Sequence, residues 1–224
     1  MHKENLLSHN WLVIRANNDF LRRCLPLPGV IYDFGCGTRP YEEDFLEHAD
    51  RYIGVDWSNT PHKLKADIVA DLNKPLPIAN EVADHVVSFQ VLEHLSEPQV
   101  MLREAHRILR PEGTLRLAVP FQWWIHEEPW DFCRYTRYGL SQMLAKAGFS
   151  QVQIEESSGF WAMWFLKLNY QTLRIIRGPF LVRRSIRWSL VPFWWANQRL
   201  APLLDRHWAE PRETAGYYVT AKKI

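Results

Sequence analysis

The sequence predicts an α/β fold with a doubly wound, mostly parallel sheet. Short apolar runs typical of buried strands alternate along the chain with patterns typical of amphipathic helices. Several of these runs end on an acidic residue or lead into a glycine turn, as strands do at the ligand-binding edge of an open sheet. Such alternation indicates parallel β-α-β units, whose connections are short and right-handed.

The expected elements follow one another along most of the chain. A first helix begins near residue 6 and ends near Pro26–Gly29. Strands are predicted at 30–32, 52–55, 68–70, 82–89, 115–119, 152–154 and 217–221. Helices are predicted at 42–49, 98–109 and 140–147, with Arg110–Gly113 as the turn that stops the second of them.

The segment 160–210 departs from this alternation, because a short connection would suffice between the last two strands. We therefore expect three parts: an N-terminal helix over 1–27, a main domain over 28–159 and 211–224, and a basic, tryptophan-rich helical insertion over 160–210.

Composition limits the possible functions. The chain has 224 residues and is 47% apolar, which suits one globular domain with an appendage. A net charge of +2 gives no reason to expect nucleic acid as a partner. The three cysteines are widely spaced without a Cys-x-x-Cys pair, so neither a metal site nor a disulfide framework is predicted. The N-terminus shows no continuous apolar signal segment, and a cytoplasmic location is expected.

The turn after the first strand is the most informative motif. The strand ends on Asp33, and Gly35 and Gly37 follow. Glycine lacks a Cβ, so the backbone can turn sharply and a ligand can lie directly against it. A dinucleotide fingerprint would need a third small residue where this sequence has Pro40. A bound pyrophosphate is therefore disfavoured.

A second acidic residue closes the next strand. The carboxylate of Asp56 is placed to accept hydrogen bonds from both hydroxyls of a ribose. Trp57 beside it is placed to stack on one face of adenine. A solvated aspartate and a core or surface tryptophan are the structural alternatives.

The order of the motifs resembles the class I S-adenosylmethionine (SAM)-dependent methyltransferases, whose first motif reads acid-x-Gly-x-Gly. The resemblance covers about residues 28–155 and includes the Leu-Glu-His-Leu run at 92–95 and the segment 107–115. Glu112 stands where the family often has glycine.

The resemblance implies a Rossmann-like sheet of seven strands with an antiparallel last strand, and SAM as the cofactor. It places the glycine turn against the methionine part of SAM, Asp71 and Leu72 against adenine, and Gln90 facing the sulfonium. The implied cofactor-binding residues are Asp33, Phe34, Gly35, Cys36, Gly37, Asp56, Trp57, Asp71, Leu72 and Gln90.

The segment after the fifth strand, residues 120–140, is expected to bind the acceptor, because loops at this edge commonly carry function. It resembles a methyltransferase subgroup with a His-x-x-Pro-x-Asp-x-x-Arg-Tyr-Thr segment. His126 is the first candidate for a general base, because imidazole titrates near neutral pH, and His94 is the second. A structural role is the alternative for His94. The expected acceptor-binding residues are Glu127, Asp131, Arg134 and Tyr135, with an Asp131–Arg134 pair under packed aromatics as the alternative.

These motifs predict direct in-line transfer of a methyl group from SAM to an acceptor that the sequence does not identify. A non-catalytic module that binds SAM or a partner is the alternative. A nicotinamide oxidoreductase is disfavoured by Pro40 and by the Leu-Glu-His-Leu run.

The insertion has an unusual charge pattern. No acidic residue occurs between Glu156 and Asp205, where basic residues alternate with aromatic ones. This suits an interfacial helix on anionic lipid over 160–204, and membrane contact would favour a lipid-linked or glycan-type acceptor. The acceptor is thus expected to be a small molecule or a lipid-linked one. A substrate lid or a dimer face fits as well, and RNA binding less well. The longest uncharged run, 188–198, is shorter than the about 20 residues that a membrane span needs.

Overall fold

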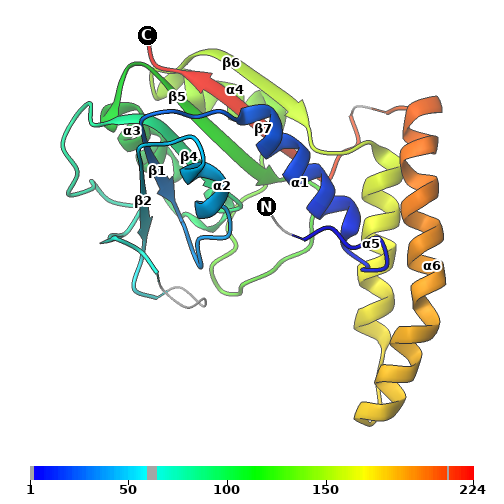
Figure 1. The fold of residues 1–224 in the computed structure, drawn as a ribbon. Coiled ribbons are helices and arrows are strands. Elements are labelled where there is room, and N and C mark those ends of the chain that lie inside the picture. Colours follow the sequence, from blue (N-terminus) through cyan, green and yellow to red (C-terminus); the bar gives the residue numbers. More distant parts are fainter. Residues whose placement is uncertain (1–2, 60–64, 211) are drawn as a thin grey trace. The chain divides into compact units, whose positions relative to one another are not determined.

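The computed structural model describes residues 3–59, 65–210 and 212–224, and the chain divides into two compact units (Figure 1). The first unit comprises Arg22–Glu155 and Gly216–Ile224. The second comprises the chain up to Leu21 together with Glu156–Ala215. Helix α1 (Trp11–Cys24) therefore crosses from the second unit into the first.

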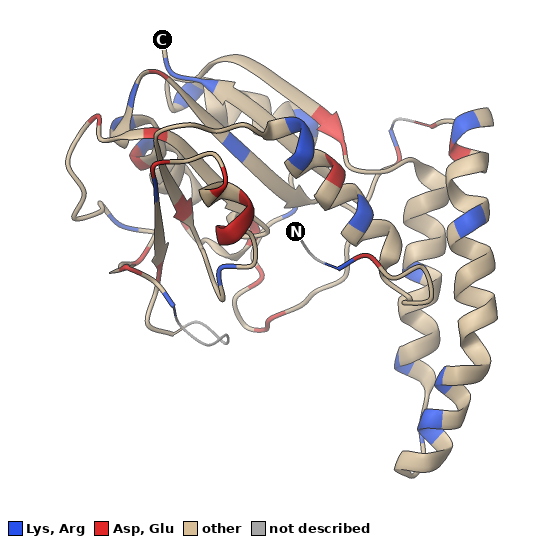
Figure 2. Cartoon of the chain, viewed as in Figure 1, with Lys and Arg blue, Asp and Glu red and all other residues tan. Residues whose placement is uncertain are grey.

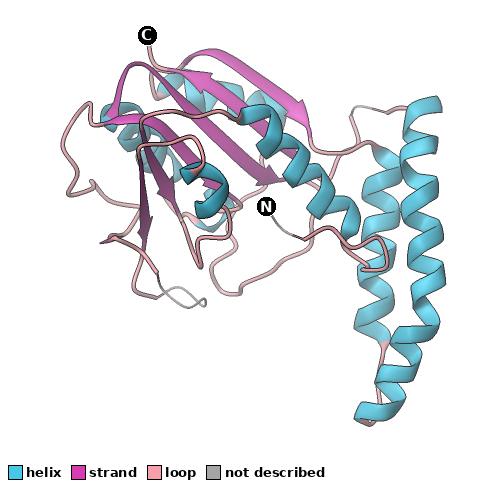
Figure 3. Ribbon diagram, viewed as in Figure 1, coloured by secondary structure: helices cyan, strands magenta, loops and turns pink. Residues whose placement is uncertain are grey.

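The first unit is built on one seven-stranded sheet, drawn in magenta in Figure 3. Its strands lie in the order β3-β2-β1-β4-β5-β7-β6. In chain order they are β1 Val30–Phe34, β2 Arg51–Asp56, β3 Ile68–Val69, β4 Ala83–Phe89, β5 Leu109–Pro120, β6 Ser150–Glu156 and β7 Gly216–Lys222.

The pairing of the strands confirms the predicted fold class. Strand β1 pairs in parallel with β2 on one side and with β4 on the other, while β7 runs antiparallel to β5. The strand order thus reverses between β1 and β4. In open α/β sheets such a reversal opens a crevice at the carboxyl ends of the two strands, where ligands bind.

The helices of the first unit are α2 (Glu42–Leu46), the 3-10 turn η1 (Leu92–His94), α3 (Pro98–Ile108) and α4 (Arg137–Lys146). Pro98 opens α3, where its fixed φ suits the first turn and its missing N–H costs nothing. The buried residues of α3 recur at helical spacing and face the core: Met101, Leu102, Ala105 and Ile108. Met101, Leu102 and Ile108 each contribute about 1.5–3 kcal/mol by their burial, and the smaller Ala105 contributes less.

The predicted turn at Arg110–Gly113 is wrong, because β5 begins directly after α3. The amide of Glu112 donates to the carbonyl of Lys223 at 2.8 Å, and the amide of Lys223 donates to Gly113 at 2.9 Å. These contacts carry the segment into the sheet as an irregular strand. Glu112 has a φ of +67°, a left-handed conformation that explains why a glycine suits this position.

Two helices are shorter than the sequence predicts, the first at its start and α2 at its end. Residues 6–10 form turns, because local side chains compete for the backbone: the amide of Leu7 donates to Oδ1 of Asn5 at 3.0 Å. Helix α2 ends at Leu46 rather than at Ala49.

The second unit is a pair of long helices, α5 (Phe160–Ile175) and α6 (Phe180–His207), with the N-terminal segment packed on them. Buried amides join these parts. Asn197 donates to Asn169 at 2.8 Å, and Gln198 donates to the carbonyl of Leu6 at 2.7 Å. Asp205 accepts hydrogen bonds from two amides in the first turn of α5. Within the described ranges, neither helix is long and apolar enough to cross a membrane.

Candidate functional site

The two positions after β1 that hold glycine differ in what surrounds them. Both lie at positive φ, +78° for Gly35 and +51° for Gly37. A Cβ on Gly35 would lie 2.3 Å from a methyl group of Val91, so packing requires glycine there. A Cβ on Gly37 would meet no heavy atom within 4 Å among the residues described. The backbone of Gly37 therefore faces open space in which a ligand can lie.

Asp56 joins the end of β2 to this turn. Its side chain is buried and accepts hydrogen bonds from the amides of Gly37 and Trp57, each at 2.8 Å. A carboxylate can accept about four hydrogen bonds, so this anchoring is compatible with hydroxyl groups of a ligand as well. The carboxylate thus lies directly beside the open space over Gly37.

Asp33 lies deeper than the sequence suggested. It is 3% exposed and accepts a hydrogen bond from the hydroxyl of Tyr52. Burial raises the pKa of this carboxyl to about 7, against the hydrogen bond from Tyr52, which lowers it. The structure therefore gives Asp33 a partner inside the sheet.

The remaining cofactor candidates lie along the same edge of the sheet. Oδ1 of Asp71 accepts hydrogen bonds from the amide and the side chain of Asn73, both at 3.0 Å. Leu72 is buried in the core. Gln90 follows β4 with a φ of +59°. Trp57 packs edge-on against Trp130, with ring centroids 5.1 Å apart.

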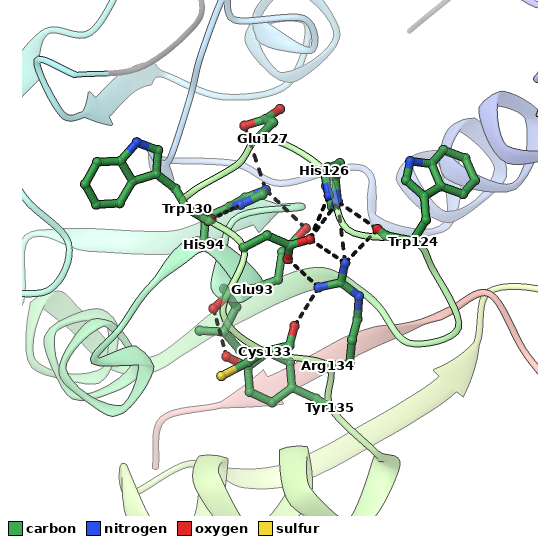
Figure 4. Close-up of polar contacts among 11 residues, drawn as sticks. Glu93, His94, Trp124, His126, Glu127, Trp130, Cys133, Arg134 and Tyr135 are labelled. Atoms are coloured by element: carbon green, nitrogen blue, oxygen red, sulfur yellow. Dashed lines mark hydrogen bonds and ion pairs between the residues drawn. The ribbon is translucent and has the colours of Figure 1, made fainter. Parts of the chain in front are cut away.

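Two histidines from different elements meet beside this edge (Figure 4). His94 belongs to η1, which follows β4, and His126 belongs to the loop that follows β5. Their ring centroids lie 4.9 Å apart. Because β4 and β5 are neighbours in the sheet, their carboxyl ends bring these residues together.

Asp131 and Arg134 form a clamp that shapes this loop. Nη2 of Arg134 donates to Oδ2 of Asp131 at 2.7 Å and to the carbonyl of Trp124 at 2.9 Å. The Arg134 guanidinium holds the pKa of Asp131 down at about 2. Oδ2 of Asp131 also accepts from the amide of His126 at 2.8 Å. The structure thus favours the alternative in which these two residues pair.

Tyr135 has a place in the core. It is buried, and its hydroxyl donates to the carbonyl of Leu92 at 2.8 Å. Glu127 lies closer to the histidines: its Oε2 is 3.9 Å from Nε2 of His94. Of the expected acceptor-binding residues, Glu127 and Asp131 therefore both bring a carboxylate to the histidine pair, and Oδ2 of Asp131 lies 3.3 Å from Nδ1 of His126.

Glu93 is a further acidic residue of this site, and the sequence motifs do not predict a role for it. Its side chain is fully buried, and burial raises its pKa to about 8. Oε1 lies 3.7 Å from Nε2 of His94. Neither carboxylate oxygen has a hydrogen-bond partner within the described part of the chain. The Leu-Glu-His-Leu run marked this residue, but only the folded loop over it shows that it is enclosed.

The reversal of strand order, the open glycine turn and the acidic strand ends define an α/β domain suited to a nucleoside-type cofactor. Residues 32–117 match the family described as methyltransferase domain. This matched domain is of the class I SAM-dependent methyltransferase type, whose cofactor is SAM.

Curated relatives and solved structures agree with this class. A ubiquinone biosynthesis O-methyltransferase of Pseudomonas paraeruginosa is 26% identical over 130 residues, which cover 53% of this chain and 52% of that protein. A probable S-adenosylmethionine-dependent methyltransferase of Mycolicibacterium smegmatis is 25% identical over 183 residues, covering 76% and 68%. The chain thus spans about half the length of the first of these relatives.

The fold is similar to that of Haemonchus contortus phosphoethanolamine N-methyltransferase 2, solved with S-adenosyl-L-methionine. The TM-score is 0.60 at 17% identity, and the match covers 97% of this chain and 56% of that chain. The open space over Gly37 and the position of Asp56 fit the cofactor of this class.

Proposed function

We propose that this protein transfers a methyl group from SAM to an acceptor hydroxyl, and that a lipid at an anionic membrane surface carries the acceptor. The contact between His94 and His126 at the carboxyl edge carries the first half of the proposal. The name O-methyltransferase of the Pseudomonas relatives supports a hydroxyl rather than an amine.

The loop leaves a basic nitrogen on each histidine. Nδ1 of His94 lies 2.5 Å from the carbonyl of Trp130. A carbonyl only accepts hydrogen bonds, so Nδ1 carries the proton and Nε2 carries the lone pair. Nδ1 of His126 lies 3.3 Å from the carbonyl of Trp124 and 3.3 Å from Oδ2 of Asp131. These two acceptors favour the same tautomer over the single donor, Nη2 of Arg134, which is farther away at 3.5 Å.

The chain's own residues position the acceptor and take its proton. SAM supplies the electrophilic methyl group on its sulfonium. The hydroxyl proton passes to Nε2 of His126, or of His94 as the second candidate, as the new O–C bond forms and the S–C bond breaks. Asp56 holds the ribose hydroxyls, and the backbone of Gly37 lies against the methionine part of the cofactor. Alignment of the two reactants contributes on the order of 7–11 kcal/mol.

The proposed binding to an anionic membrane surface rests on the second unit. Basic and apolar residues lie at the end of the helix pair where α5 meets α6, and Figure 2 shows Lys and Arg without Asp or Glu there. Four large apolar side chains at this end are between 64% and 73% exposed: Ile175, Phe180, Leu181 and Trp188. Exposed apolar groups among arginines suit insertion between the headgroups of anionic lipids.

A cavity of about 490 Å³ lies beside this end and entirely within the second unit. Its lining combines cationic and apolar groups: Asn5, Leu7, Phe180, Arg183, Arg184, Arg187, Trp188, Val191 and Trp194. Guanidinium groups bind phosphate in bidentate fashion, while the aromatic walls suit the start of an acyl or isoprenoid chain. The cavity therefore supports an anionic lipid as the molecule that is held here.

The proposal is tested by an acceptor screen with SAM labelled in its methyl group. The purified chain is offered vesicles of a bacterial lipid extract and, separately, the water-soluble metabolites of the same cells. Label in the organic phase is expected. Label only in soluble products would overturn the lipid half. SAM binding without methyl transfer to either fraction would favour the alternative, a non-catalytic module that binds SAM.

A further inference from the structure

Glu93 is enclosed without the partners that a buried carboxylate needs. Its side chain has no exposed surface, and no described residue hydrogen-bonds either oxygen. Such a group is costly, and in native proteins it calls for a reason. Protonation does not supply one at the observed separations, because the new O–H would still lack an acceptor. A bound cation would satisfy both oxygens.

Two imidazoles converge on this carboxylate. One ligand atom each from Glu93, His94 and His126 lies within 4.8 Å of the other two. Three ligands spaced evenly around one cation, each about 2.2 Å from it, lie about 3.6–3.8 Å apart. The 3.7 Å between Oε1 of Glu93 and Nε2 of His94 fits this spacing, and any separation near 4.8 Å has to close by about 1 Å for the three side chains to share one ion.

The surrounding loop holds the histidines as metal ligands are usually held. Nδ1 of His94 faces the Trp130 carbonyl, and Nδ1 of His126 faces the Trp124 carbonyl and Asp131. Such partners fix the tautomer and the ring orientation and leave Nε2 to coordinate. Figure 4 shows these contacts gathered around the two rings.

The charges around Glu93 are mixed. The Arg134 guanidinium acts on it as a positive charge, and the carboxylates of Asp131 and Glu127 act as negative ones. Glu127 approaches His94 to 3.9 Å from the outer side of the loop, within reach of a fourth ligand position.

We propose that Glu93, His94 and His126 bind one divalent transition-metal cation, such as Mn²⁺ or Zn²⁺. Two histidines and one carboxylate leave coordination positions open, and a hydroxylated acceptor fills them with its oxygens. The cation acts as a Lewis acid, so that the acceptor hydroxyl ionises at neutral pH and its proton passes to Glu127 or to water. The role in methyl transfer rests on the function proposed above. The proton acceptor then differs between the two states of the chain: Nε2 of His126 takes the proton without the ion, and Glu127 or water takes it with the ion, because a coordinated Nε2 cannot also take a proton.

The test uses the full chain, freed of metal by chelation and dialysis. Mn²⁺ binding is measured by the paramagnetic resonance signal of the free ion, and Zn²⁺ binding by competition with a chromophoric chelator. We expect one ion per chain, and at least about tenfold weaker binding in Glu93→Gln and in His94→Gln. Glu128→Gln and His48→Gln, at exposed positions outside the cluster, should bind as the wild type does. Calorimetry with SAM checks that each variant is folded, and His94→Gln carries the test if Glu93→Gln does not fold.

Each outcome decides between the claims. Absence of binding, or equal binding by the two cluster variants, would overturn the site. Methyl transfer at an undiminished rate by the metal-free chain would overturn the role of the ion in catalysis. Ion binding without transfer to any acceptor would overturn the proposed function and leave the site standing.

Discussion

His94 and His126 approach each other with ring centroids 4.9 Å apart and ring planes at 73°. The residues come from two loops that follow neighbouring strands of the sheet. Both rings are held by backbone carbonyls through Nδ1, at 2.5 Å and 3.3 Å. The pair is therefore a property of the folded edge and not of either loop alone.

Replacement of His126 by alanine should separate binding from turnover. SAM binding should be unchanged, because no element of the glycine turn contacts the His126 ring among the interactions described. The turnover number with the true acceptor should fall about 10²–10⁴-fold, the usual contribution of a positioned acid–base group. The exposed His48→Ala variant is the matched control. Turnover equal to that of the wild type would remove His126 from the chemistry.

The two glycines of the turn should fail in different ways when each is replaced by alanine. In Gly35→Ala the new methyl group collides with Val91 at 2.3 Å, so the melting temperature should fall. Gly37→Ala pays only the cost of a left-handed residue, about 1–2 kcal/mol, because no described atom opposes the methyl group. It should remain folded yet bind SAM at least about tenfold more weakly. Calorimetry and thermal unfolding of both variants distinguish these results.

Part of this site follows from the sequence, and part does not. The turn at Gly35 and Gly37 and the acid at Asp56 were predictable, because each depends on a few neighbouring residues and on where a strand ends. The enclosure of Glu93 was not, because it depends on a loop that folds back from β5 through contacts such as the Phe132 amide on the Glu93 carbonyl at 2.9 Å. For the same reason the predicted acceptor residue Tyr135 lies in the core: its hydroxyl finds a distant carbonyl that no local pattern reveals.

The clamp between Asp131 and Arg134 makes the loop sensitive to acid. The folded-state pKa of Asp131 is about 2, below its ordinary value of 3.8, so the stabilisation is present above pH 4 and is lost as the pH falls towards 2. Arg134→Met should remove this dependence and lower the free energy of unfolding by about 3 kcal/mol at pH 7, since it leaves a buried carboxylate unpaired. Chemical unfolding at pH 2.5, 4 and 7 measures both effects. A wild type and a variant with parallel pH profiles would contradict the clamp.

Asp33 should give the opposite pH dependence. Its folded-state pKa of about 7 lies above the ordinary 3.8, so the unfolded chain releases the proton first, and the free energy of unfolding falls between about pH 4 and pH 7. Asp33→Asn keeps an acceptor for the Tyr52 hydroxyl and cannot ionise. As the pH rises, the free energy of unfolding of the variant should therefore increase relative to that of the wild type, by up to about 4 kcal/mol above pH 7. Denaturant unfolding between pH 4 and 8 measures this change. A difference in unfolding free energy between the two proteins that does not vary with pH would contradict the prediction.

The exposed end of the helix pair should decide whether the protein binds membranes. Phe180 and Leu181 are 72% and 73% exposed in the first turn of α6, so the double replacement Phe180→Glu and Leu181→Glu leaves the helix packing unchanged. It places two negative charges where insertion needs apolar groups, and flotation with anionic vesicles should fall at least about tenfold. Arg183→Gln with Arg184→Gln should weaken binding by about 1 kcal/mol for each arginine, and should flatten its salt dependence.

Leu203→Glu is the matched control for this surface, because Leu203 lies near the other end of α6 and is 56% exposed. It should float with the vesicles as the wild type does. If Leu203→Glu loses binding to the same degree as the double variant, the interaction is not local to the end that contains Phe180. If the wild type fails to float with anionic vesicles even at low salt, the membrane surface is not a partner, and the arginines are left to serve a lid or a second copy of the chain.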